Sequence, residues 1–245
     1  VAIQVVYYFT AAVALGAPHR KIAFTVPTGN FGDVYAGYVA SRMGLPIDRL
    51  VVATNVNDIL VRTFATGTYE IRDVIATTSP SMDIQVSSNF ERLLFDAYGR
   101  DAQAVRALMA SLAQHRRFVL SASAIKELRS LFTADRADEQ ESAAEIRAWV
   151  READYCVDPH TAVALAVAEK EKRDPSVPMV VLSTAHPAKF PDAVKAACGV
   201  TPALPDTLAD LGRRNERIVV LPADQTAVER YVTSVSRAAR EGAAA

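Results

Sequence analysis

The stretch that decides the fold is residues 22–44, which read IAFTVPTGNFGDVYAGYVASRMG. Its apolar start, Ile22–Val26, is rich in β-branched and aromatic residues and is stopped by Pro27, which predicts a short buried strand. Turn-forming residues follow at 28–33, and the small residues within 36–40 give one helical face. The stretch therefore predicts a strand, a tight loop and a helix that packs closely on a sheet.

The loop Thr28-Gly29-Asn30-Phe31-Gly32-Asp33 is a glycine-flanked turn that opens a helix. Such a turn directs several backbone N–H groups and the positive end of the helix dipole into one concavity, so a phosphate is the expected ligand. The spacing alone leaves a purely structural turn equally open. It matches neither the Walker phosphate loop, which needs Gly-Lys-Ser/Thr, nor the three-glycine dinucleotide fingerprint.

Short continuous apolar runs alternate with helical patterns along the rest of the chain. Arg49–Ala53, Met179–Ser183 and Arg217–Leu221 are predicted strands. Runs that are apolar throughout are typical of a parallel sheet covered on both faces, so the sequence predicts a doubly wound α/β fold with a mostly parallel sheet. The other expected segments are helices at 1–15, 101–115, 122–132, 142–150 and 162–168, an acidic loop at 135–141, a last helix with Val228, Tyr231, Val232 and Val235 buried, and a frayed tail at 241–245.

Several polar residues have helix capping as their simplest explanation. Ser88–Glu91 fits a capping box, and Asp158-Pro159 suits the first positions of a helix. His160 would then lie in the first turn, where capping geometry and catalysis explain it about equally well. For Asn57-Asp58 capping is favoured over ligand contact, although both follow a strand at the sheet edge where α/β proteins bind ligands.

Composition excludes several classes of function. The 245 residues are 50% hydrophobic with a formal net charge of −1, so the chain can bury a substantial core. Acidic and basic residues are interspersed, so we expect no nucleic-acid partner and no membrane patch. No apolar run approaches about 18 residues, and no signal peptide is expected. Cys156 and Cys198 lack zinc-like spacing, so we expect no metal site. Two distant cysteines suit a reducing compartment, so we expect a cytoplasmic location.

A series of strings resembles, in family order, the pyridoxal-phosphate-dependent threonine synthases, and together they cover nearly the whole chain. They are PTGNFGD at 27–33, GLPI at 44–47, ATNVND at 53–58, SPSMDI at 79–84, SSNFER at 87–92, DPHTA at 158–162 and STAHPAKF at 183–190. The resemblance implies the fold of the fold-type-II pyridoxal-phosphate enzymes, which include tryptophan synthase β. It also implies a carbon-oxygen lyase that converts O-phospho-L-homoserine and water to L-threonine and phosphate, the last step of threonine biosynthesis.

The resemblance also implies a set of site residues. The residues expected to bind the phosphate of the pyridoxal 5'-phosphate cofactor are Gly29, Asn30, Phe31, Gly32 and Asp33. Thr184 is expected to face the pyridine nitrogen with its hydroxyl; without the resemblance it would read as a cap or turn residue. His186 and Lys189 could each help bind an anionic substrate, but a turn histidine and a surface lysine are common, and neither is counted as a site residue.

One departure from the family bears on activity. The Schiff-base lysine of such enzymes lies in a Phe-Lys-Asp context, and none of the six lysines here has those neighbours. The chain starts at Val1 with an uncapped segment that is apolar nearly all round. We therefore expect residues 1–245 to be the C-terminal portion of the enzyme, with no catalytic lysine of its own. That lysine would lie upstream of Val1, in an N-terminal half of the same polypeptide, and the portion alone would be inactive.

Two other functions are open. One is another fold-type-II enzyme, such as a serine/threonine dehydratase or a cysteine synthase, against which the strings at 53–58 and 183–190 argue. The other is a non-catalytic phosphate-binding domain on the same fold, because a fold does not define a function. The missing lysine is the best support for this second reading.

Overall fold

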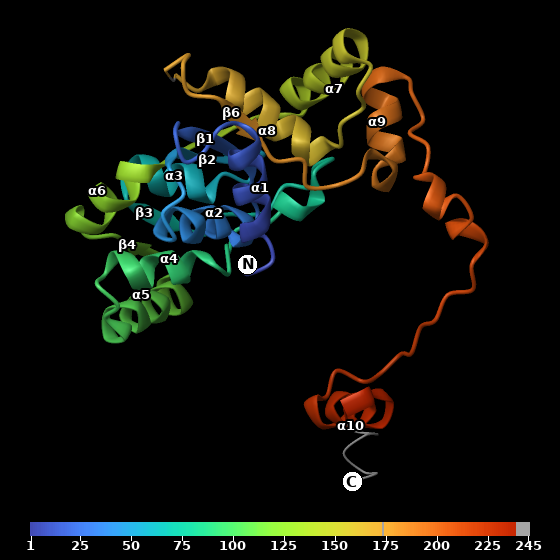
Figure 1. The fold of residues 1–245 in the computed structure, drawn as a ribbon. Helices are drawn as coiled ribbons and strands as arrows, with labels where there is room; N and C mark the ends of the chain where they lie inside the picture. The colour runs from blue at the N-terminus through green and yellow to red at the C-terminus, as the bar shows by residue number, and fades with distance from the viewer. Residues whose placement is uncertain (173, 239–245) are drawn as a thin grey trace. The chain divides into compact units, whose positions relative to one another are not determined.

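A four-stranded parallel sheet lies at the centre of Val1–Ala203, the first of two units in this computed structural model (Figure 1). The structure describes residues 1–172 and 174–238, so the tail expected at 241–245 lies outside the described residues. The strand order is β5-β2-β1-β6, and every neighbouring pair is parallel. The strands are β1 Ile22–Pro27, β2 Ile47–Thr54, β5 Phe132–Arg136 and β6 Met179–Val181.

Helices cover both faces of this sheet. Helices α1 (Val5–Ala14) and α2 (Gly32–Arg42) share one core with Leu50 and Val52 of β2. The alternate residues Val51 and Ala53 enter a second core with α8 (Pro159–Lys170) on the opposite face. Successive side chains of a strand point to opposite faces, so β2 is buried on both sides. The doubly wound α/β fold predicted from the apolar runs is confirmed.

The small face predicted for the helix after the loop is confirmed, and it has two neighbours. Ala36 and Ala40 are fully buried on α2. A Cβ atom added to Gly37 would lie 2.6 Å from Cε1 of Tyr8 on α1 and 2.8 Å from Cδ2 of Leu50 on β2. Glycine therefore allows α2 to approach the sheet and α1 at once.

The remaining elements of the first unit include two features that the pattern did not predict. β5 occupies residues expected to end a helix and begin an acidic loop, and β3 pairs with β4 as an antiparallel hairpin. The prediction of an acidic loop at 135–141 is wrong, because Asp138 caps a helix that begins at Glu139. The bounds are α3 Ile59–Thr66, β3 Thr68–Glu70, α4 Phe90–Ala97, α5 Ala102–His115, β4 Arg117–Val119, α6 Ala122–Leu131, α7 Glu139–Ala153 and α9 Pro191–Cys198.

One of the predicted helix caps is confirmed and two are wrong. The Asp158 carboxylate accepts hydrogen bonds from the backbone N–H groups of the first turn of α8, as expected. No capping box forms at Ser88–Glu91, because α4 begins after Asn89, which makes no side-chain cap. Asp58 precedes α3 without capping it with its side chain; its carboxylate instead binds Arg62 at 2.9 Å and Arg136 at 2.8 Å.

The second unit, Leu204–Ala245, contains α10 (Gln225–Val235) and two short 3-10 turns. Asp224 caps α10 by accepting a hydrogen bond from the N–H of Ala227. The predicted buried stripe on α10 is wrong, since the side chains of Val228, Val232 and Val235 are exposed. The strand predicted at 217–221 is also wrong: within the described residues the segment pairs with no strand.

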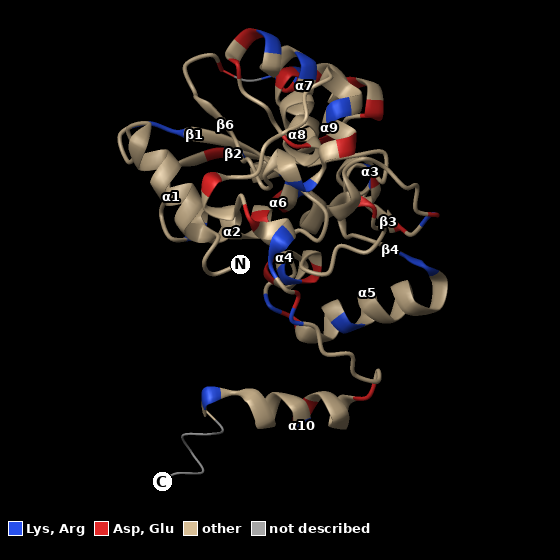
Figure 2. Ribbon diagram, turned by 90° about the vertical axis from the view of Figure 1, so that its right-hand side faces the viewer, with Lys and Arg blue, Asp and Glu red and all other residues tan. Residues whose placement is uncertain are grey.

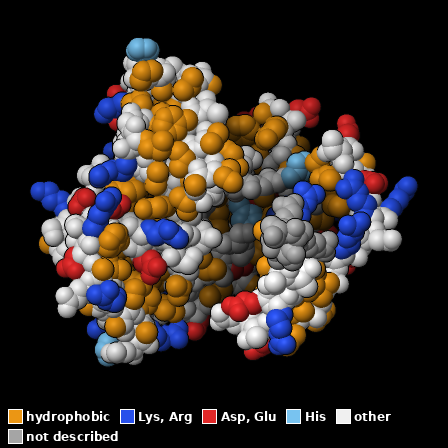
Figure 3. Space-filling model, turned by 60° about the horizontal axis from the view of Figure 1, so that its bottom comes forward, with side chains coloured by type: hydrophobic (Ala, Val, Ile, Leu, Met, Phe, Trp, Pro, Cys, Tyr) orange, Lys and Arg blue, Asp and Glu red, His pale blue; other side chains and the backbone are white. Residues whose placement is uncertain are grey.

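On the faces that Figures 2 and 3 show, the charged side chains of the described residues are mixed in sign. Figure 2 shows Lys and Arg scattered among Asp and Glu along the helices, and Figure 3 shows the same scatter among hydrophobic side chains on one face. Across residues 1–172 and 174–238, no helix combines the length and the apolar character that crossing a membrane requires.

Candidate anion-binding site

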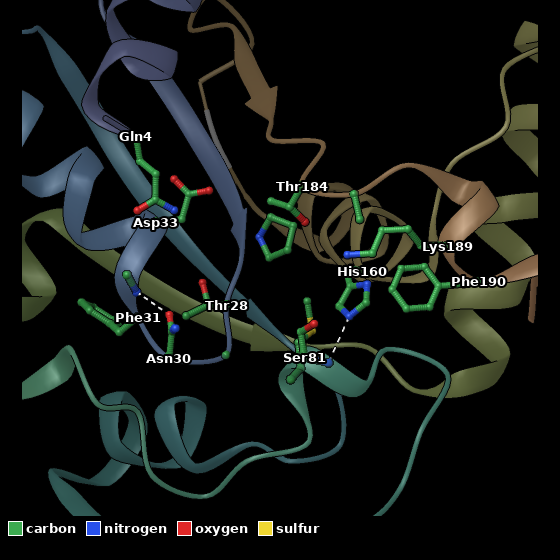
Figure 4. Close-up of a pocket in the computed structure, with 15 residues that line it drawn as sticks. Gln4, Thr28, Asn30, Phe31, Asp33, Ser81, His160, Thr184, Lys189 and Phe190 are labelled. Carbon is green, nitrogen blue, oxygen red and sulfur yellow. Dashed lines mark hydrogen bonds between the residues drawn. The ribbon is translucent and has the colours of Figure 1, made fainter. Parts of the chain in front are cut away.

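A cavity of about 230 Å³ lies at the carboxyl edge of the parallel sheet. Its walls come from the loop after β1, from Ser81 and Met82, from the first turn of α8, and from residues 184–190 after β6. Figure 4 shows Asn30 and Asp33 of the loop on one side, facing Thr184, His160 and Lys189 on the other. Segments far apart in the sequence meet here because all the parallel strands end at this edge.

The loop after β1 has an unusual backbone at Phe31. This residue precedes α2 with φ 66° and ψ 8°, a left-handed conformation that residues other than glycine rarely adopt. Its ring is 1% exposed, with ring centroids 5.2 Å from Phe90 and 5.9 Å from Phe132. Core packing of the ring therefore stabilises the turn. A left-handed residue beside helical ones makes successive N–H groups converge, which creates a concave anion site.

The carbonyl groups of the loop are held by the segment 87–89. Ser87 Oγ donates to the carbonyl oxygen of Gly29 at 2.6 Å, and the backbone N–H and side-chain amide of Asn89 donate to that of Asn30 at 3.0 and 3.1 Å. In a trans peptide the N–H points opposite to the carbonyl. The N–H groups that follow, on Asn30 and Phe31, therefore point away from segment 87–89.

Within the residues that the structure describes, these N–H groups have no partner of their own. In the described part of the chain, the backbone N–H groups of Gly29, Asn30, Phe31 and Asp33 donate no hydrogen bond, whereas that of Gly32 donates to Asn30 Oδ1 at 2.9 Å. Unpaired donors at the start of an eleven-residue helix, together with its dipole, favour an anion. We call the backbone of residues 29–33 the anion cup.

The carboxyl group of Asp33 lines the cavity next to these donors. The Tyr8 hydroxyl lies 2.8 Å from the backbone oxygen of Asp33 and 3.4 Å from its Oδ1. Burial raises the pKa of the Asp33 carboxyl above its ordinary 3.8, and the hydrogen bond from Tyr8 offsets part of that rise. Burial, and then Asp33, raise the pKa of Tyr8 well above 10. The pair fixes the start of α2 against α1.

The opposite wall presents Thr184 and Lys189. The Thr184 hydroxyl makes no hydrogen bond within the described residues, so the capping explanation for this residue is wrong. His186 caps the following turn instead, through Nδ1, and does not line the cavity. Lys189 is the one Lys or Arg among the lining residues. No group of three or more His, Cys, Asp or Glu in the described ranges could hold a metal ion.

The structure brings all six predicted site residues around this one cavity, namely Gly29, Asn30, Phe31, Gly32, Asp33 and Thr184. Asn57 and Asp58 do not line it. Sequence reasoning missed Ser81, Met82 and Phe190, and it left His160 undecided. The family strings at 79–84 and 158–162 contain Ser81, Met82 and His160. Nothing in either string indicates that the two segments lie together in the fold.

The fold and the site together define a doubly wound α/β protein with a candidate anion site at the carboxyl edge of its sheet. A family model described as "Threonine synthase, C-terminal" matches residues 161–232. Beyond that match, the chain is similar to threonine synthases over nearly all of its length, as the relatives described next show.

The relatives are similar to this chain over nearly all of its length. Threonine synthase of Pseudomonas aeruginosa is 48% identical over 231 residues, which are 94% of this chain and 49% of that protein. A crystal structure of threonine synthase from Brucella melitensis with bound pyridoxal phosphate aligns with a TM-score of 0.89 and 58% identity, covering 96% of this chain and 51% of that one. Threonine synthase from yeast aligns with a TM-score of 0.82 and 36% identity. The chain thus spans about half the length of the relatives it matches.

Proposed function

We propose that residues 1–245 form the C-terminal portion of a threonine synthase and supply its cofactor-phosphate site. The reaction converts O-phospho-L-homoserine and water to L-threonine and phosphate, with pyridoxal 5'-phosphate as cofactor. The observation that carries the proposal is the anion cup, whose unpaired N–H groups meet at the N-terminus of α2. The Brucella relative, whose structure contains pyridoxal phosphate, supports the identity of the cofactor.

The residues of the cup fit a phosphate group. Phosphate oxygens only accept hydrogen bonds at neutral pH, and the N–H groups of Gly29, Asn30, Phe31 and Asp33 are donors without partners in the described residues. Gly32 has a different task, because its N–H is bound by Asn30 Oδ1 at 2.9 Å and so maintains the shape of the loop.

Thr184 and Lys189 would act from the opposite wall. When bound, the cofactor supplies an electron sink for carbanion chemistry. The uncommitted hydroxyl of Thr184 supports a hydrogen bond to the pyridine nitrogen, and a hydroxyl there leaves that nitrogen less fully protonated than a carboxylate would. The ammonium of Lys189 would attract the phosphate of the substrate, since it is the one cationic Lys or Arg in the lining.

The position of the lysine that binds the cofactor covalently distinguishes this proposal from a non-catalytic domain. Lys189 lines the cavity, but its neighbours Ala188 and Phe190 differ from the Phe-Lys-Asp context of the family. We therefore place the Schiff-base lysine in an N-terminal half of the same polypeptide, and we infer that residues 1–245 alone are inactive. We also propose a cytoplasmic location, since Cys156 and Cys198 are both free thiols.

The experiment combines chemical labelling with product analysis. The 245-residue chain is mixed with pyridoxal phosphate and reduced with borohydride, and mass spectrometry should find no single labelled lysine. Addition of the N-terminal half should produce one labelled lysine in that half and release L-threonine and phosphate from O-phosphohomoserine. Specific labelling of Lys189 would contradict the proposal. A 2-oxo acid product would indicate a dehydratase, and phosphate binding without turnover in the full-length protein would indicate a non-catalytic domain.

A further inference from the structure

His160 links three segments that form the cavity. Its side chain is 5% exposed, and its Nδ1 lies 2.9 Å from Oδ1 of Asp158. Its Nε2 accepts a hydrogen bond from the backbone N–H of Ser81 at 3.2 Å, the contact that is dashed in Figure 4. The centroid of its ring lies 4.8 Å from that of Phe190.

These contacts define the protonation of the ring. A backbone N–H can only donate, so Nε2 must be the unprotonated acceptor. A carboxylate can only accept, so the proton lies on Nδ1 and is donated to Asp158. Both nitrogens of His160 are therefore engaged within the protein, and neither is available to exchange a proton with a ligand in the cavity.

The acidic partner of His160 is held firmly. Asp158 is fully buried. Its carboxylate accepts the backbone N–H of His160 at 2.9 Å, that of Thr161 at 3.4 Å, and the Thr161 hydroxyl. The imidazole is thus attached to the start of α8, which is itself buried along most of its length.

Ser81 lies between His160 and the anion cup. A Cβ atom added to Gly29 would lie 2.2 Å from the carbonyl oxygen of Ser81, so the two backbones are in direct contact. The far end of the Ser81 segment is anchored by Asp83, whose carboxylate accepts from Asn55 at 2.8 Å and from Thr77 at 2.7 Å. The backbone N–H of Ser81 itself donates to His160 Nε2.

We propose that His160 is a positioning residue for the anion cup, which it keeps in shape by holding the Ser81 backbone against Gly29. The proposal rests on the proposed function, because the cup is taken to bind the cofactor phosphate. Without the bond from Nε2, Ser81 loses its link to α8, and its carbonyl oxygen can shift from Gly29 even though Met82 stays buried and its N–H still donates to the Ser79 carbonyl at 3.0 Å. The contact between the Ser81 and Gly29 backbones, which orients the N–H groups of the cup, is then weakened.

Two variants of the full-length enzyme separate the two contacts of the ring. In His160→Gln the side-chain amide reaches the position of Nε2 and can accept from the Ser81 N–H. In His160→Asn the shorter amide reaches the position of Nδ1, so it keeps the bond to Asp158 and loses the one to Ser81. His19→Asn, at an exposed histidine outside the cavity, is the matched control.

The first measurement is the dissociation constant of pyridoxal phosphate. We expect His160→Asn to weaken binding about tenfold, the equivalent of one lost hydrogen bond, while His160→Gln and His19→Asn stay within about threefold of the parent. The phosphorus NMR signal of the bound cofactor should shift in His160→Asn alone. Equal affinities and equal phosphorus shifts in the parent and His160→Asn would overturn the positioning role. A parent that does not bind pyridoxal phosphate would instead overturn the proposed function.

The second measurement does not depend on a variant that folds. Nitrogen-15 NMR of the imidazole in the parent enzyme should report a neutral ring protonated on Nδ1. A ring protonated on Nε2 could not accept from Ser81, and that result would overturn the proposal even if His160→Asn were too unstable to study.

Discussion

Gly29→Ala tests how closely the anion cup packs on its neighbour. The added Cβ would lie 2.2 Å from the carbonyl oxygen of Ser81 and 3.2 Å from its carbonyl carbon. The clash is with backbone, which cannot rotate aside, so the two segments must separate by about 0.8 Å to bring the oxygen to the 3.0 Å below which real contacts are essentially absent. Overpacking of this kind costs about 1–3 kcal/mol of folding free energy. A misplacement of about 1 Å can lower the rate at a catalytic site about 100-fold, which shows how sensitive such geometry is.

We therefore expect Gly29→Ala to weaken pyridoxal phosphate binding by at least about tenfold in the full-length enzyme. Absorbance titration measures this, with urea unfolding recorded in parallel. Gly32→Ala should weaken pyridoxal phosphate binding less, since the added Cβ meets only the ends of side chains, Asn30 Oδ1 at 3.0 Å and Asn89 Nδ2 at 3.4 Å. Gly212→Ala is the control, because its Cβ meets nothing within 4 Å. A folded Gly29→Ala enzyme with the affinity of the parent would refute the reasoning.

Three further variants test other contacts. Thr184→Ser should keep turnover in the full-length enzyme, whereas Thr184→Ala should lose about 1–3 kcal/mol of transition-state stabilisation with an unchanged melting temperature; unchanged turnover would remove Thr184 from the site. Tyr8→Phe should lose about 0.5–1.5 kcal/mol in urea unfolding at neutral pH. Burial and Asp33 raise the pKa of Tyr8 well above 10, so the unfolded chain releases the proton first and parent stability should fall as pH rises above 10. Tyr8→Phe should show a smaller fall, because burial also raises the pKa of Tyr35, Tyr38 and Tyr69, and matching pH profiles would count against the contact. Glu145→Gln should stabilise the fold at pH 7 by up to about 1 kcal/mol, because burial and then Glu169 raise the pKa of Glu145. The gain should vanish below the ordinary pKa of 4.5, and destabilisation at pH 7 would contradict it.

The strand, loop and helix at residues 22–44 could be predicted because every local signal there agrees. The apolar run, the turn residues and the small helical face each favour the same unit, and the structure contains it as β1, the loop and α2. When local preferences agree with the global fold in this way, the structure of a segment can be predicted from its sequence.

Two strands show where local pattern fails, in opposite directions. Phe132–Arg136 reads FTADR, too polar to predict a buried strand, yet it forms β5 because it can pair with the edge of β2. Arg217–Leu221 has the apolar pattern, but within the described residues no strand lies beside it. A strand depends on its neighbours as much as on its own residues.

The contact between His160 and Ser81 at the cavity could not be predicted from the sequence for a related reason. His160 and Ser81 are 79 positions apart, and the DPHT string is explained locally by the cap that Asp158 forms. A hydrogen bond between an imidazole nitrogen and a distant backbone N–H leaves no trace in spacing. Only the three-dimensional arrangement distinguishes a cap residue from one that also holds a second segment.

The pairing of β1 with β6 has a consequence for the order of assembly. β1 starts at Ile22 and its partner ends at Val181, so one edge of β1 stays open until most of the chain has been synthesised. At about 5–20 residues per second, that interval lasts roughly 8–30 s on the ribosome. During it β1 is an edge strand with unpaired backbone groups, the arrangement most prone to pairing with another chain.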